Sequence, residues 1–131
     1  MDVLIIPEAR GEIEALMALR PRPGTWGVIV GHKLGSRFVV EKIGAGGSPG
    51  TVPDERTLAE LERIWPGRIV GIAAVRPGGA FNKALLGPAW YAKLILRLSG
   101  TARTPVLRSH MVEFKRRFIL EPVPLAPAVK E

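Results

Sequence analysis

The sequence contains no cysteine and only two histidines, His32 and His110. Without thiols the chain can form no disulfide, no thiolate nucleophile, no iron–sulfur cluster and no zinc site that uses sulfur ligands. Two histidines cannot supply a three-histidine metal site either. The composition therefore argues against several large classes of metalloenzyme and thiol enzyme, and we expect no metal and no other cofactor.

Long apolar runs are also absent. The longest are residues 69–75 and residues 90–98, and the second is interrupted by Lys93 and Arg97. Both fall well short of the roughly 20 residues that a helix needs to cross a bilayer. The first residues show neither a basic segment nor a small-residue cleavage site. We therefore expect no membrane partner and a cytoplasmic location.

The chain does have the composition of a folded domain. Its 131 residues are 47% hydrophobic and 24% charged, which is typical of one globular domain and not of a disordered chain. The last ten residues contain three prolines spaced among apolar residues. We predict one domain over residues 1–121 and a Pro-rich C-terminal tail, extended or mobile, over residues 122–131.

Positive charge is concentrated in the C-terminal third, within a net charge of +7. Between Lys83 and Arg117 the only acidic residue is Glu113. Such a segment either covers solvated faces or attracts phosphate backbones or acidic protein surfaces. A nucleic-acid interface would require its cations on one face. Its candidate residues are Lys93, Arg97, Lys115, Arg116 and Arg117.

Hydrophobic periodicity and turn residues predict the elements of the first half. We expect a strand over residues 3–6, a helix over residues 9–19 and a hairpin formed by residues 25–30 and 36–43. A glycine-rich loop over residues 44–50 follows. A second helix begins at Asp54, a good N-cap, and ends before Pro66-Gly67.

The second half is predicted to contain a buried strand, a helix and two closing strands. Residues 68–75 are almost continuously apolar, as in a central strand. Pro88 suits the first position of a helix. On that helix, the side chains facing the core of the domain would be Tyr91, Leu94, Ile95 and Leu98. Residues 105–109 and 111–120 are then expected as strands.

Several catalytic motifs can be tested and rejected. The segment from Gly78 to Lys83 lacks the glycine and hydroxyl residue that flank the lysine of a Walker loop, so nucleotide hydrolysis is not indicated. On a strand, Ser109 and His110 would point to opposite faces and could not act together. We interpret His110 and His32 as packing or surface residues, and the three tryptophans as core residues.

The predicted order of helix, hairpin, glycine loop, helix, buried strand and helix resembles the JAB/MPN (Mov34, PAD-1) family. The similarity runs from about residue 21 to residue 98. It is strongest at Gly27-Val-Ile-Val-Gly31 and at Ile69-Val-Gly-Ile72, which leads into Pro77-Gly78. The resemblance implies a single α/β (α+β) domain with a mixed, curved sheet and flanking helices.

Catalytic members of that family are zinc isopeptidases, and this chain lacks their functional residues. The resemblance places the family's glutamate on Gly24, its two zinc-binding histidines on Ala74 and Arg76, its serine on Ala84 and its zinc-binding aspartate on Gly87. Residues 72–98 contain no histidine, aspartate or glutamate that could replace them. The resemblance therefore implies a metal-free domain without isopeptidase activity.

We accordingly expect a non-catalytic scaffold or protein-interaction domain whose partner is another protein or a second copy of the chain. The former cleft would be lined by Arg76, Asn82 and Lys83, and its cations could hold an anionic C-terminus or a phosphate. Two alternatives stay open. One is nucleic-acid binding through the basic third, and the other is an enzyme with unrelated chemistry in the altered cleft.

Overall fold

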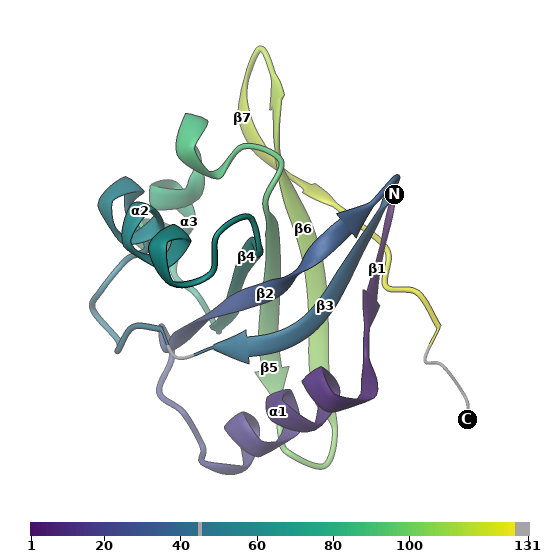
Figure 1. The fold of residues 1–131 in the computed structure, drawn as a ribbon. Coiled ribbons are helices and arrows are strands. Elements are labelled where there is room, and N and C mark those ends of the chain that lie inside the picture. Colours follow the sequence, from purple (N-terminus) through teal and green to yellow (C-terminus); the bar gives the residue numbers. More distant parts are fainter. Residues whose placement is uncertain (45, 128–131) are drawn as a thin grey trace.

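A computed structural model describes residues 1–44 and 46–127, in which seven strands form one mixed, curled sheet with helices on both of its faces (Figure 1). The strand order across the sheet is β1-β3-β2-β4-β5-β6-β7. The expected single α+β domain is confirmed. The elements are β1 (Asp2–Ile5), α1 (Pro7–Ala18), β2 (Trp26–Leu34), β3 (Arg37–Gly44), α2 (Glu55–Ile64), β4 (Ile69–Val75), α3 (Gly79–Leu85), a 3₁₀ turn η1 (Pro88–Trp90), β5 (Leu94–Gly100), β6 (Pro105–Lys115) and β7 (Arg117–Pro122).

Local sequence signals explain the hairpin and the helix that follows it. Strands β2 and β3 pair antiparallel, and Gly35 in the turn between them has a φ of 57°, which glycine adopts without strain. Helix α2 begins where the Asp54 carboxylate accepts a hydrogen bond from the Thr57 amide at 2.8 Å. These elements match the predicted hairpin and the predicted N-cap.

Strand β4 lies at the centre of the sheet and is buried along its whole length. It pairs antiparallel with β2 and parallel with β5. The connection from β4 to β5 passes through α3 and η1, as a crossover between parallel strands requires. The carboxyl ends of β4 and β5 therefore lie side by side.

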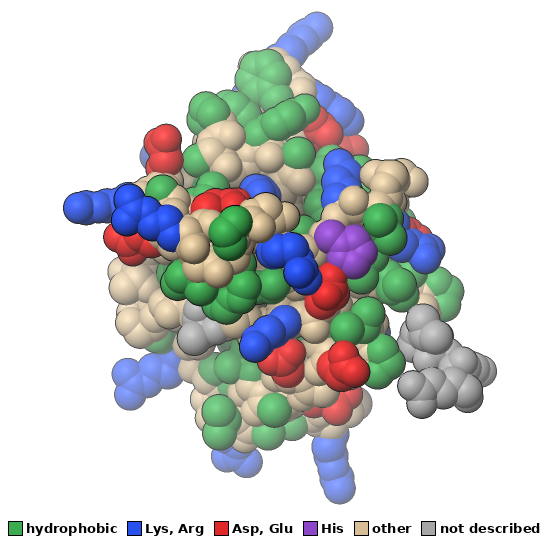
Figure 2. Space-filling model, viewed as in Figure 1, with side chains coloured by type: hydrophobic (Ala, Val, Ile, Leu, Met, Phe, Trp, Pro, Cys, Tyr) green, Lys and Arg blue, Asp and Glu red, His purple; other side chains and the backbone are tan. Residues whose placement is uncertain are grey.

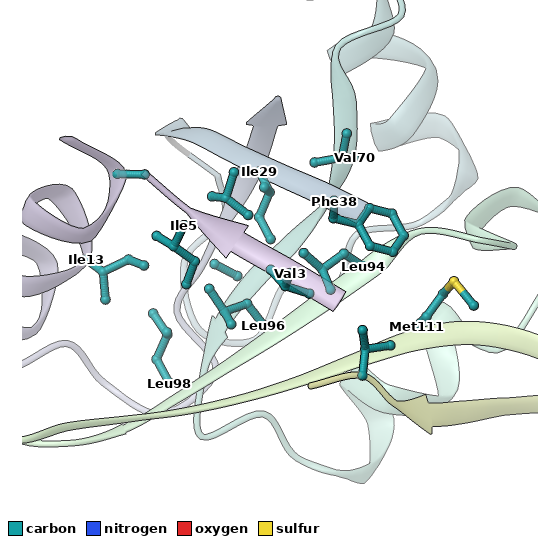
Figure 3. Close-up of a cluster of buried hydrophobic side chains, with 14 of the residues drawn as sticks. Val3, Ile5, Ile13, Ile29, Phe38, Val70, Leu94, Leu96, Leu98 and Met111 are labelled. Atoms are coloured by element: carbon teal, nitrogen blue, oxygen red, sulfur yellow. The ribbon is translucent and has the colours of Figure 1, made fainter. Parts of the chain in front are cut away.

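Two hydrophobic clusters fill the two faces of the sheet. Helix α1 covers one face, where the buried residues drawn in Figure 3 include Val3 of the edge strand β1, Ile13 of α1 and Leu96 of β5. Helices α2 and α3 cover the other face over Ile72 and Ile95. On β5, residues 94, 96 and 98 therefore belong to the first cluster, while residue 95 belongs to the second.

The described part of the Pro-rich tail is extended and attached to the domain. Val123 is buried and its amide donates to the Ser109 carbonyl at 3.0 Å. Val3 donates to Pro124 at 3.0 Å and accepts from Ala126 at 2.7 Å. The tail therefore covers the outer edge of β1, which would otherwise expose unpaired backbone groups. Residues 128–131 lie outside the described residues.

The prediction of a helix starting at Pro88 is wrong beyond its first turn. Only η1 is helical, and the segment from Leu94 onward is strand β5. Its side chains alternate between the two hydrophobic clusters and the strand pairs on both sides, which outweighs the helical spacing of Leu94, Ile95 and Leu98. The chain also stays in one strand through His110, and it turns at Arg116, whose φ is 66°.

Among the described residues, no helix is both long enough and apolar enough to cross a membrane.

Candidate binding site at the end of strand β4

The carboxyl end of β4 is bound to the segment that precedes β2. The Gly24 amide donates to the Val75 carbonyl at 2.7 Å, and the Val75 amide donates to the Thr25 carbonyl at 2.8 Å. Ala74 lies opposite Trp26 in the register between β4 and β2. The structure thus brings position 24 close to positions 74 and 76, which are distant from it in the sequence.

Arg76 follows β4 in a left-handed conformation, with a φ of 40°, which is strained for a residue with a side chain. Its amide donates to the Leu98 carbonyl at 2.9 Å, and its Nη2 donates to the Gly100 carbonyl at 3.2 Å. Both contacts lie on β5. The exposed guanidinium of Arg76 is therefore directed along the end of β5.

Asn82 and Lys83 occupy helix α3, where they do not join Arg76 in a common hollow. Arg76 lines two hollows in the surface, and neither includes Asn82 or Lys83. Asn82 is half-buried, and its Oδ1 has no hydrogen-bond partner among the described residues. Lys83 is exposed in the last turn of α3.

The positions that the family resemblance assigns to zinc chemistry carry no ligand here. Ala74 is fully buried in the cluster beneath α2 and α3. Ala84 lies near the end of α3, about 7.5 Å along the helix axis from its start, and Gly87 lies beyond that end. Within residues 1–44 and 46–127, no three histidine, aspartate or glutamate side chains are grouped closely enough to hold a metal ion.

The two histidines have separate surroundings. His32 Nδ1 contacts the Glu41 carboxylate, which also accepts from Arg68 Nη2 at 2.9 Å. His110 is half-buried on β6, and the pKa of its imidazole is lowered by burial first and then by the positive charges of Arg97 and Arg108. Ser109 points to the opposite face and donates to the Val123 carbonyl. The prediction that Ser109 and His110 point to opposite faces of the strand is confirmed.

The candidate nucleic-acid residues are distributed over different parts of the molecule. Lys93 Nζ donates to the Ile69 carbonyl at 2.7 Å and lies 3.6 Å from a Glu62 carboxylate oxygen. Lys115 pairs with Glu121 at 3.1 Å. Arg116 and Arg117 are exposed at the β6–β7 turn, which projects from the body of the domain (Figure 1).

Arg97 is far from that turn. It lies opposite Arg108 in the register of β5 and β6, and Lys115 is the seventh residue after Arg108 along β6. At about 3.3 Å per residue this is about 23 Å. On the face shown in Figure 2, lysine and arginine side chains are likewise spread out, with acidic side chains among them. The structure therefore does not gather the five candidates into one patch.

Sequence reasoning missed one residue of the basic group at the end of β5. Arg108 lies directly opposite Arg97, and Arg76, Arg97 and Arg108 line one hollow. The available signal was the segment between Gly100 and Pro105, which is short enough to join two antiparallel strands. Interpreting residues 94–100 as a strand would have placed Arg97 near Arg108.

Comparison with known proteins gives structural similarity only. No protein-family model matches the sequence, and no curated protein matches it. The fold is similar to the solution structure of protein DSY2949 from Desulfitobacterium hafniense, with a TM-score of 0.65 and 17% identity over 98% of this chain and 95% of that one. It is also similar to the solution structure of a protein from Salinibacter ruber, with a TM-score of 0.55 and 14% identity over 96% and 92% of the two chains. At these identities the similarity supports the fold alone.

Proposed function

We propose that this chain is a non-catalytic protein-interaction or scaffold domain of the MPN type, acting in the cytoplasm. One observation carries the proposal. At the end of β4 the backbones of Gly24 and Val75 are hydrogen-bonded, while Ala74 is fully buried. The position that would carry the first zinc-binding histidine is therefore a packed methyl group, and its neighbour at position 24 has no carboxylate.

The neighbouring arginine supports the same proposal. Zinc hydrolases need neutral imidazole or carboxylate ligands and a general base near the bound water. Arg76 supplies a permanent cation, which repels a metal ion and cannot accept a proton at neutral pH. The end of β4 is thus suited to holding an anionic group and not to activating water.

The partner class can be tested by affinity capture with the purified full chain, at low and at high salt, followed by mass spectrometry and nucleic-acid staining. A specific protein partner, recovered without nucleic acid, is the expected result, and its capture should weaken in high salt to the extent that an anionic group at Arg76 contributes. Size-exclusion chromatography with light scattering identifies a second copy as the partner. Recovery of nucleic acid alone, lost as salt rises, would contradict the proposal and favour the nucleic-acid alternative.

A further inference from the structure

A small hollow of about 200 Å³ lies where β4 and β5 end side by side. It is lined by Arg76, Pro77, Arg97, Leu98, Ser99 and Arg108. We call these six residues the arginine hollow. Three separate segments contribute its cations: the loop after β4, strand β5 and strand β6. Because these three segments are neighbours at one end of the sheet, the fold itself fixes their relative positions.

Within residues 1–44 and 46–127, no acidic side chain neutralises the cations of the arginine hollow. Arg97 and Arg108 face each other directly across β5 and β6, an arrangement of like charges that disfavours strand pairing. The sequence has no aspartate or glutamate between Glu62 and Glu113. Among the described residues, the ion pairs include none of these three arginines.

Arg97 also has one side-chain donor that the residues described by the structure leave unpartnered. Its Nε is buried, yet it has no hydrogen-bond partner among the described residues. Buried donors in folded proteins are nearly always satisfied by protein, water or a bound molecule. Arg97 lines the hollow, and the other N–H groups of its guanidinium can donate hydrogen bonds to an anionic ligand there.

The surroundings of the hollow show that its field is positive and that its geometry is fixed. Burial and the charges of Arg97 and Arg108 lower the pKa of His110, the next residue on the same face of β6. Arg76 is held against β5 by hydrogen bonds from its amide and its Nη2, despite its left-handed backbone. Residues kept in such a conformation are frequently found at ligand sites.

We propose that the arginine hollow binds the phosphate group of a phosphate monoester, with Arg76, Arg97 and Arg108 as its cationic ligands. A monoester phosphate carries nearly two negative charges and three acceptor oxygens, so it can satisfy several guanidinium groups at once. A carboxylate offers one charge and two oxygens, and it would leave more of the cationic charge uncompensated. This site goes beyond the proposed function and does not depend on the family resemblance.

Isothermal titration calorimetry of the full chain with inorganic phosphate and with glycerol phosphate tests the site, with acetate at equal ionic strength as the monoanion control. We expect one phosphate per chain and affinity for acetate at least about tenfold weaker, because each hydrogen bond to a charged group contributes on that scale. No binding of either phosphate compound, or equal binding of acetate, would overturn the proposal.

Three variants localise the binding. Arg97→Met and Arg108→Gln are each expected to weaken phosphate binding by about tenfold or more. The matched control Arg117→Gln removes an exposed arginine at the β6–β7 turn and should leave the affinity unchanged. If Arg97→Met does not fold, Arg108→Gln alone decides the outcome. Equal loss in Arg117→Gln would show that binding follows net charge and would overturn the site.

A short single-stranded oligonucleotide separates this site from a nucleic-acid interface. Its internal phosphates are diesters with one charge each, so we expect weaker binding than for glycerol phosphate. Binding of the oligonucleotide without binding of either phosphate compound would overturn the proposal. It would indicate instead that the basic residues bind nucleic acid.

Discussion

Gly47 and Trp26 exchange two backbone hydrogen bonds, each with an N···O distance of 3.1 Å. The Trp26 indole also donates to the Thr51 hydroxyl at 3.0 Å. The described part of the glycine-rich loop is therefore attached to the start of β2, beside the segment that binds the end of β4. This contact requires a residue without a side chain at position 47.

Gly47→Ala should destabilise the domain by about 1–3 kcal/mol, the usual range for overpacking. A Cβ at position 47 would lie 2.2 Å from Trp26 Nε1 and 2.4 Å from Thr51 Oγ1. The loop would have to move away from β2, breaking the paired hydrogen bonds. Urea unfolding followed by tryptophan fluorescence measures the change in the free energy of unfolding.

Gly11→Ala provides a control of opposite sign. Gly11 lies inside α1, and nothing is within 4 Å of an added Cβ. Alanine should stabilise the helix by about 0.5–1 kcal/mol, since glycine loses more backbone entropy on folding. If Gly47→Ala behaved like Gly11→Ala, the attachment of the loop to Trp26 would be contradicted.

The attachment of the C-terminal segment is tested by Ser109→Ala. The Ser109 hydroxyl is buried and donates to the carbonyl of Val123, which is itself buried. Its removal leaves a buried carbonyl without this donor and should cost about 1–3 kcal/mol. Ser99→Ala is the matched control, because Ser99 forms no side-chain hydrogen bond within the described residues. Equal melting temperatures for the two variants would show that the segment after β7 does not contribute to stability.

His110 should make stability depend on pH near neutrality. Its pKa in the folded protein is below the ordinary value of 6.5, because of burial and the charges of Arg97 and Arg108. The unfolded chain therefore binds its proton more readily. This contribution to stability is fully present above pH 6.5 and is lost as the pH falls through the lower folded pKa.

His110→Gln should flatten that dependence. Melting temperatures of the two proteins, measured from about pH 7.5 down to about pH 5, should diverge in slope across the titration range of histidine. Asp2 and Asp54 also have lowered pKa values, through hydrogen bonds from Arg37 and Thr57 respectively. Because their ordinary value is 3.8, their contributions are lost in a more acidic range. Parallel curves for the two proteins between pH 5 and 7.5 would contradict the account of His110.

Local sequence signals predicted those elements that local chemistry determines. The hairpin, the N-cap at Asp54 and the apolar strand β4 each depend on neighbouring residues. Strand β5 was predicted as a helix because Leu94, Ile95 and Leu98 fit either period. Only pairing with β4 and β6 decides between them, and that pairing joins residues distant in the sequence.

The same dependence on pairing limited the prediction of the candidate site. Arg76 directly follows the end of β4, and the family resemblance predicted it as a binding residue. Arg97 becomes part of the arginine hollow only when it lies opposite Arg108, which requires the register of β5 and β6. Helix α3 was missed because it has only seven residues and begins at glycine, which weakens its sequence signal.

Metal analysis of the purified chain after zinc loading and dialysis, combined with an isopeptidase assay, tests the central claim most directly. The claim is that the end of β4 keeps its position beside Gly24 but holds no metal and hydrolyses no isopeptide bond. We predict no stoichiometric zinc and no cleavage above the rate without protein. One zinc per chain together with cleavage would contradict it.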